Sequence, residues 1–218
     1  MRIKLILSKN TEPVDFNYKK QVTVMFHKWV GRNNVHNKIS LYSISDLKRA
    51  KASKNHLDFP NGSVMCISAH DKNIIKKIID SLSEDNTFIC GMMVSEVIII
   101  DTPHFVHQEV FLLDSPVLIR RYEENKNIYY TYSDEKAGKH LADTLRRKLD
   151  VAGMDYGDFT IEFDKSYLKA RTKLISYDGI FNIVSICPVI IKGDNRVKRF
   201  AWNVGLGNST GIGFGALK

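Results

Sequence analysis

The sequence predicts a mixed α+β fold in which strands and helices follow one another in the same order twice. Apolar residues recur with the period of a strand in some segments and with the period of a helix in others, and turn residues separate these segments. The length of 218 residues fits two compact units of about 100 residues each. A hydrophobic content of 44% is enough for two cores.

The first half reads as a strand, a helix, two strands, a helix and a strand. Apolar residues alternate from Arg2 to Leu7, whereas from Val22 to Val30 they recur at helical spacing before a stop at Gly31. Asp71 opens a second amphipathic helix, and the segment from Lys48 to Gly62 is polar and is predicted to be an exposed loop. The predicted elements span residues 2–7, 22–30, 39–45, 64–68, 71–82 and 91–100. This order is that of a ferredoxin-like domain.

The second half repeats this order more loosely. A strand set begins at 110–119 and continues at 129–132, and a helix is predicted from Ser133 to about Ala152. Two strands at 168–177 and 180–191 form a hairpin across Asp178-Gly179, a strong turn signal. A short basic helix and a glycine-rich closing strand complete the unit. We therefore predict tandem ferredoxin-like domains at residues 1–107 and 108–218.

The charge balance indicates a polyanionic partner. A net charge of +8 and a pI near 9.3 favour nucleic acid or an anionic membrane surface. No run approaches the roughly 18 apolar residues of a membrane span, and the first residues do not resemble a signal peptide. The three cysteines lack the spacing of a zinc site and are typical of buried thiols in a reducing cytosol. We expect a cytoplasmic protein without membrane contact.

The last stretch of the chain carries the strongest signal for a ligand. Five of the 13 glycines lie between Gly205 and Gly215. Main-chain N–H groups without side chains in the way can form an anion-binding nest, so we expect one here. The spacing matches neither a dinucleotide-binding loop nor a P-loop. A basic, aromatic helix from Arg196 to Trp202 precedes it, so the combination suggests RNA. The candidate RNA-binding residues are Arg196, Lys198, Arg199, Gly205, Gly207, Asn208, Ser209, Gly211 and Gly213.

Further basic and aromatic residues are secondary candidates for RNA contacts. Arg120 and Arg121 form one basic pair, and a second basic run extends from Arg146 to Lys148. Tyrosines between Tyr129 and Tyr132 offer a platform on which bases stack. Each run is also compatible with an ordinary solvated face.

The glycine-rich end resembles the terminal motif of the CRISPR-associated endoribonucleases that cut precursor CRISPR RNA within its repeats, members of the superfamily of repeat-associated RNA-binding (RAMP) proteins. The matching residues are Gly205-x-Gly207 followed by Gly211-x-Gly213-Phe214-Gly215. The strand from Leu41 to Ser45 and the segment from Leu113 to Val117 resemble two further family motifs. The resemblance implies tandem ferredoxin-like domains and CRISPR repeat RNA as the partner.

Cleavage of RNA without a metal needs a base for the 2′-OH, an acid for the leaving 5′-oxygen and positive charge for the phosphorane. Histidine suits either proton transfer, and the dispersed acidic residues favour a mechanism with no metal or other cofactor. The family places its catalytic histidine in the loop after the first helix, where His36 and, as a source of positive charge, Lys38 stand here. His27, on the outer side of the helix, is the rival candidate. Many members carry a tyrosine in that helix, and Phe26 stands at the matching position.

Two functions follow from the resemblance. The first is a metal-independent endoribonuclease that cleaves precursor CRISPR RNA within its repeats and leaves a 2′,3′-cyclic phosphate and a 5′-OH. The alternative is a non-catalytic RNA-binding subunit that holds CRISPR RNA in an effector complex. In either case other effector subunits are possible partners, and the chain is expected to be a monomer or a homodimer.

Overall fold

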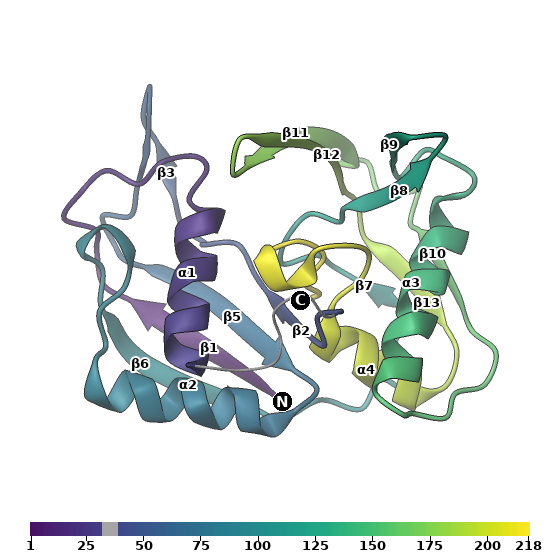
Figure 1. The fold of residues 1–218 in the computed structure, drawn as a ribbon, viewed down its shortest axis with the longest axis horizontal. Helices are drawn as coiled ribbons and strands as arrows, with labels where there is room; N and C mark the ends of the chain where they lie inside the picture. The colour runs from purple at the N-terminus through teal and green to yellow at the C-terminus, as the bar shows by residue number, and fades with distance from the viewer. Residues whose placement is uncertain (32–38) are drawn as a thin grey trace.

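The computed structural model describes residues 1–31 and 39–218 and has the predicted α+β architecture (Figure 1). The first half contains one four-stranded antiparallel sheet in the order β2-β5-β1-β6, which is the strand order of a ferredoxin-like domain. Its elements are β1 (Arg2–Leu7), α1 (Lys19–Val30), β2 (Tyr42–Ile44), β5 (Ser63–Ala69), α2 (Lys72–Glu84) and β6 (Val94–Ile100). Helices α1 and α2 lie side by side on one face of this sheet.

Local sequence explains most of these boundaries. Asp71 caps α2 by accepting a hydrogen bond from the backbone N–H of Asn73, and Gly31 ends α1 with a φ of 67°. The loop between β2 and β5 contains a small hairpin of β3 (Lys51–Ala52) and β4 (Leu57–Asp58). The last strand begins later than predicted, because a 3-10 turn at Ile89–Gly91 precedes it.

The second half has the same strand order with its last strand missing. Strand β7 (Val110–Phe111), helix α3 (Ala137–Val151), β10 (Thr160–Phe163), β13 (Val189–Lys192) and helix α4 (Asn195–Val204) follow in sequence, and the sheet order is β10-β13-β7. We predicted that the glycine-rich end closes this sheet as a strand. Instead residues 205–218 form an irregular loop with a 3-10 turn at Thr210–Ile212, and only a single bridge pairs Leu217 with Leu113.

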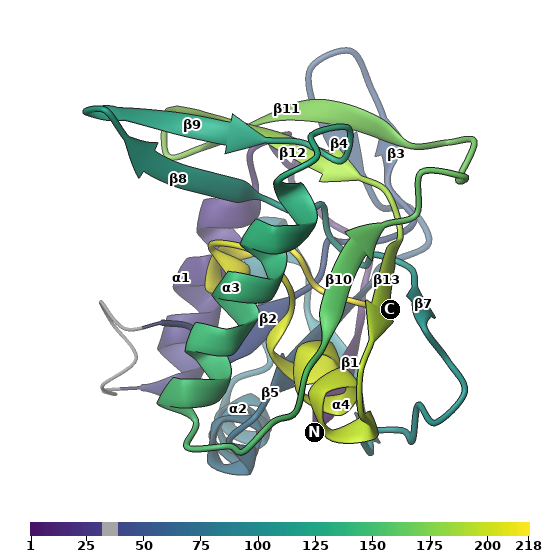
Figure 2. The same ribbon diagram turned by 90° about the vertical axis from the view of Figure 1, so that its right-hand side faces the viewer.

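Two hairpins project from the second half (Figure 2). One joins β8 (Ile119–Glu123) to β9 (Lys126–Tyr130), so the strand predicted at 110–119 is broken into shorter pieces. The other joins β11 (Arg171–Tyr177) to β12 (Ile180–Ile186) across Asp178-Gly179, as predicted. Both turn residues have positive φ, 51° and 78°, which is the geometry of a two-residue hairpin turn.

The apolar side chains gather into two main cores. One is built by buried residues between Ile3 and Val94, and the other by buried residues between Phe105 and Leu217. The division at residue 107 stays a prediction. Among the described residues, no helix has both the length and the apolar character that crossing a bilayer requires.

Candidate functional site

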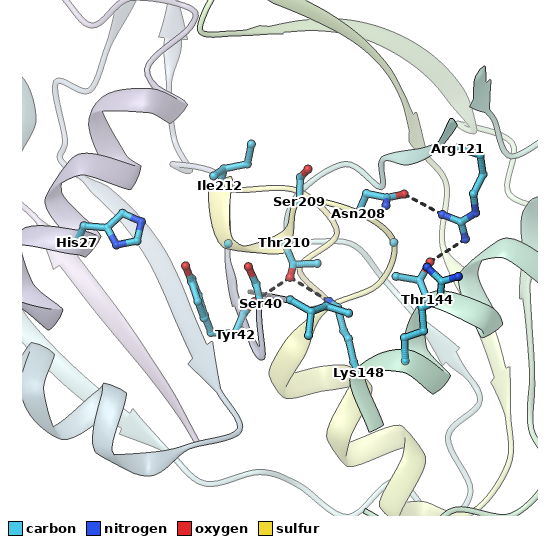
Figure 3. A pocket seen from close by; sticks show the side chains of 14 residues that line it. His27, Ser40, Tyr42, Arg121, Thr144, Lys148, Asn208, Ser209, Thr210 and Ile212 are labelled. Atoms are coloured by element: carbon cyan, nitrogen blue, oxygen red, sulfur yellow. Dashed lines mark hydrogen bonds between the residues drawn. The ribbon is translucent and has the colours of Figure 1, made fainter. Parts of the chain in front are cut away.

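A pocket of about 400 Å³, here called the glycine pocket, lies between the two halves of the molecule (Figure 3). Helix α1, the residues leading into β2, strand β8, helix α3 and the C-terminal loop all contribute to it. Its lining consists of His27, Ile39, Ser40, Tyr42, Arg121, Thr144, Arg147, Lys148 and the residues from Gly207 to Ile212. No carboxylate occurs among these described residues, so the pocket is cationic.

The glycine loop, residues 205–215, owes its shape to glycines at close approaches. Gly207 has a φ of 73°, and a Cβ atom there would overlap the carbonyl oxygen of Leu118. Gly215 has a φ of 65°, and a Cβ atom would overlap the carbonyl oxygen of Leu206. These positions therefore accept only glycine without a shift of the backbone. The loop folds back on α4 and on the segment leading into β8, and it does not extend as a strand.

The turn at the tip of this loop has open hydrogen-bond donors. Ser209 has the left-handed conformation, with φ of 61° and ψ of 33°. The main-chain N–H groups of Ser209, Thr210 and Gly211 donate to no acceptor within the described part of the chain, although their neighbours on both sides do. Successive free N–H groups at such a turn form a nest that binds an anion. This arrangement supports the predicted phosphate-binding role of the loop.

Lys148 anchors the loop from helix α3. Its Nζ atom donates to the carbonyl oxygens of Val204 and Gly205 at 2.9 and 3.2 Å and to Oγ1 of Thr210 at 3.0 Å. Thr210 in turn donates to the carbonyl oxygen of Tyr42 at 2.9 Å, so a chain of hydrogen bonds joins α3, the loop and β2. Complete burial lowers the pKa of Lys148 to about 7.

Two arginines supply charge at the other side of the pocket. Arg121 on β8 donates to the carbonyl oxygen of His140 at 2.6 Å, to Thr144 at 2.9 Å and to Asn208 at 3.4 Å. Burial, and then the nearby Arg147 cation, lowers the pKa of Arg121. Arg147 is exposed and has no ion pair among the described residues. A phosphate in the pocket therefore has two guanidinium groups within the same wall.

His27 and Tyr42 face the loop from the first half of the molecule. His27, half-buried on α1, points toward the hydroxyl group of Tyr42 (Figure 3). Phe26 is fully buried and stacks on the Tyr42 ring with centroids 4.4 Å apart. Burial raises the pKa of Tyr42, and a hydrogen bond from Ser40 opposes this shift. The phenol therefore stays protonated at neutral pH and serves as a donor.

The structure brings only part of the predicted site together. His27 and the loop residues from Gly207 to Gly211 line one pocket, whereas His36 and Lys38 lie outside the described residues. Gly205 and Gly213 are buried within the loop and do not line the pocket. Arg121 and Lys148, which we had named only as secondary candidates, belong to the pocket.

The predicted basic helix is arranged differently from our expectation. Lys198 is 3% exposed and its Nζ atom donates to the carbonyl oxygen of Phe105 at 3.4 Å, so this side chain is turned away from the surface. Arg196 and Arg199 line another recess and do not reach the glycine pocket. They stand near the start of α4, and the glycine loop follows its end.

Tyr42 is the site residue that the sequence analysis did not single out. It lies in the predicted strand from Leu41 to Ser45, which resembles a family motif as a whole and gave Tyr42 no role of its own. Because neighbouring side chains of a strand point to opposite faces, Leu41 and Tyr42 had to face different sides of the sheet, which was the one signal in the sequence. No group of three metal-ligating side chains of the His, Cys, Asp and Glu types lies together in the described residues.

The fold and the pocket define a two-domain ferredoxin-like protein with a cationic pocket between its halves. Residues 100–218 match the family model described as CRISPR associated protein Cas6, C-terminal. This match covers more than half of the chain, and the chain belongs to the Cas6 family. Among curated proteins, none has a sequence that matches this chain.

Solved structures of the same fold cover the whole chain. A structure titled CRISPR associated protein Cas6 has a TM-score of 0.83 at 20% sequence identity, with 100% of this chain and 98% of that chain covered. A Cas6-related protein of Pyrococcus furiosus has a TM-score of 0.86 at 19% identity, covering 100% and 97%. A RAMP protein described as binding different RNA substrates has a TM-score of 0.82 at 23% identity, covering 100% and 98%. At these identities the likeness establishes the tandem ferredoxin-like fold.

Proposed function

We propose that this protein is an endoribonuclease that cleaves precursor CRISPR RNA within its repeats by metal-independent acid–base catalysis. The observation that carries the proposal is the glycine pocket itself, whose described residues combine a histidine, two guanidinium groups and three open main-chain N–H groups and include no carboxylate. Membership of the Cas6 family supports processing or binding of CRISPR RNA. A pocket with these groups suits a phosphodiester and the extra charge of its phosphorane.

The proposed reaction needs two proton transfers. A base takes the proton of the 2′-OH, whose oxygen attacks the adjacent phosphorus, and an acid protonates the departing 5′-oxygen. We assign these transfers to His36 and His27. His36 and Lys38 precede Ile39, which lines the pocket, and His27 faces it from α1. Phe26 has no hydroxyl group, but its ring stacks on Tyr42 of β2. The Tyr42 hydroxyl lies beside His27 and provides a hydrogen-bond donor there.

Positive charge then stabilises the phosphorane. Arg121 and Arg147 line the pocket, and the N–H groups of Ser209, Thr210 and Gly211 are open to a phosphate oxygen. The amides are fixed by the packing of the loop, so they are aligned before the RNA arrives. The products are a 2′,3′-cyclic phosphate on one fragment and a 5′-OH on the other.

The test is incubation with RNA that contains the host CRISPR repeat, in EDTA, followed by analysis of the fragment ends. We expect cleavage within the repeat in EDTA and a cyclic phosphate on the upstream fragment. His36→Ala and His27→Ala should each lower the single-turnover rate by about 100-fold or more, because each removes one proton transfer. Their affinities for the RNA should remain within about threefold of the unsubstituted protein.

Two controls make this test decisive. His107→Ala removes an exposed histidine remote from the pocket and should leave the rate unchanged. Cleavage that requires Mg²⁺ contradicts the metal-independent mechanism. Binding of the repeat RNA without cleavage points to the alternative, an RNA-binding subunit of an effector complex.

A further inference from the structure

A second recess, of about 310 Å³, lies between the N-terminal end of α2 and one side of α4. Both ribbon views place these two helices next to each other, away from the hairpins (Figures 1 and 2). We call it the α2–α4 recess. The residues that matter here are His70, Lys72, Asn195, Arg196, Arg199 and Asn203, and no carboxylate lines it among the described residues.

The cations of this recess are largely uncompensated. Lys72 and Arg199 have no ion-pair partner within residues 1–31 and 39–218, and Arg196 pairs with Asp194 at 3.4 Å. Four carboxylates are direct sequence neighbours of residues that line the recess, and two of them, Asp101 and Asp155, are exposed. The other two, Asp71 and Asp194, act as helix caps. Each accepts from a backbone N–H at 2.9 Å, Asp71 from Asn73 and Asp194 from Val197. The recess therefore keeps a net positive charge that the fold does not neutralise.

The guanidinium group of Arg199 is held in place by its neighbours. It contacts Nε2 of His104 at 3.5 Å, and Nδ1 of the same ring contacts the side-chain amide nitrogen of Asn195 at 3.2 Å. On the opposite wall, the ring of His70 packs edge-on against Phe200 with centroids 5.1 Å apart. A positioned guanidinium next to an exposed lysine is well suited to a phosphate group.

One strand edge connects this recess to the glycine pocket. Tyr42, which lines the glycine pocket, pairs with Ala69 in the sheet. The next residue, His70, lines the recess and donates its N–H to the carbonyl oxygen of Leu41 at 2.9 Å. The recess and the glycine pocket therefore border the same edge strand, β2, within two adjacent residue pairs of the sheet.

We propose that Lys72, Arg196 and Arg199 form a second phosphate-binding site for single-stranded RNA, which continues the RNA path beyond the glycine pocket. This inference rests on the proposed function, since it places the same RNA on a second site. RNA is favoured over an acidic protein segment because the lining is cationic and amide-bearing. Its larger apolar members are Met1, Met154 and Phe200, and the one aromatic ring among them, Phe200, is only 2% exposed, which leaves little for the anchor side chain of a peptide.

The experiment measures binding of a long oligouridylate as a function of salt, so that it depends on neither the repeat sequence nor cleavage. The test variant is Lys72→Gln/Arg199→Gln. The control variant, Lys9→Gln/Lys54→Gln, removes the same charge from exposed positions in the first half that line neither pocket. Each lost phosphate contact lowers the slope of log affinity against log salt by about 0.7 for a single strand. We expect a slope smaller by about 1.4 and an affinity about 25-fold weaker at 0.1 M salt.

The outcomes separate this inference from the proposed function. A slope that is reduced in the test variant but not in the control variant supports the second site. Lys72→Glu/Arg199→Glu should weaken binding further, and its melting temperature should equal that of the control variant. Equal slopes in the test and control variants overturn it and leave an acidic protein partner as the occupant to examine. If the unsubstituted protein does not cleave repeat RNA, the result contradicts the proposed function and leaves the second site unaffected.

Discussion

Lys148 shows at the scale of one residue how the pocket is held together. It is 2% exposed, and its ammonium group donates to two carbonyl oxygens and one hydroxyl group of the glycine loop. These acceptors favour the charged form, while burial disfavours it and lowers the pKa from 10.5 to about 7. The sequence placed Lys148 in a basic helical run, but its burial depends on a loop more than fifty residues away, as the separation to Val204 of 56 positions shows. No local pattern contains that information.

Stability should therefore depend on pH through this lysine. Between pH 7 and 10.5 the folded protein binds fewer protons at Lys148 than the unfolded chain, so the free energy of unfolding rises with pH. Below pH 7 both states are protonated and the contribution is constant. Relative to Lys148→Met, the stability of the unsubstituted protein should rise from pH 7 to pH 9 by up to about 1.4 kcal/mol per pH unit. Urea unfolding of both proteins at several pH values measures this difference, and parallel curves would show that the ammonium titrates at its ordinary pKa.

The glycine loop is the element whose form differs most from the prediction. Its glycine spacing indicated an anion-binding nest, and the open N–H groups from Ser209 to Gly211 are compatible with that. Its apolar residues suggested a closing strand that would bury them. Phe214, Ala216 and Leu217 are indeed buried. Burial alone does not specify a strand. The positive φ angles of Gly205, Gly207, Gly213 and Gly215 turn the chain away from extended geometry.

Single substitutions in this loop should separate its structural from its functional glycines. Gly207→Ala combines a φ of 73° with overlap of the Leu118 carbonyl oxygen, so we expect a loss of stability of more than about 1 kcal/mol. Gly211 has no such φ, and its added methyl group would meet Ser40 Oγ at 2.5 Å and the Tyr42 hydroxyl at 2.8 Å. Gly211→Ala should therefore lose less stability than Gly207→Ala but cleave repeat RNA slowly. Thermal melting and single-turnover cleavage measured on both variants test this, and a reversed order of the two melting temperatures would contradict the assignment.

At the scale of the whole molecule, the periodicity of apolar residues was enough to predict the two halves but not the contact between them. The β-α-β-β-α-β order of residues 2–100 follows from alternating and helical apolar spacing, and the sheet order of the structure agrees with it. The contact between the halves depends on single long side chains. Arg2, read from the sequence as one polar residue of an alternating strand, is 4% exposed and lies between the halves. Its guanidinium carbon lies 3.5 Å from the centre of the Trp202 ring.

Arg2 should couple the unfolding of the two halves. It donates to Ser68 Oγ at 2.6 Å in the first half and to the carbonyl oxygens of Trp202 and Leu217 at 3.1 and 2.6 Å in the second. Arg2→Met would leave those two carbonyl groups buried without a donor, at a cost of about 1–3 kcal/mol each. We expect a lower melting temperature and a calorimetric enthalpy that exceeds the van't Hoff enthalpy, because the halves then unfold separately.

The matched control for this variant is Lys4→Met, which removes a charge two residues along the same strand and on the same face. It should unfold in the same single transition as the unsubstituted protein, since the structure gives Lys4 no hydrogen bond across the junction among the described residues. Cleavage of repeat RNA should fall in Arg2→Met alone, because the glycine pocket takes His27 from one half and Arg121, Arg147 and the glycine loop from the other. If Arg2→Met instead unfolds in one transition and cleaves at the unsubstituted rate, the halves are coupled by their apolar contacts and the arginine is dispensable.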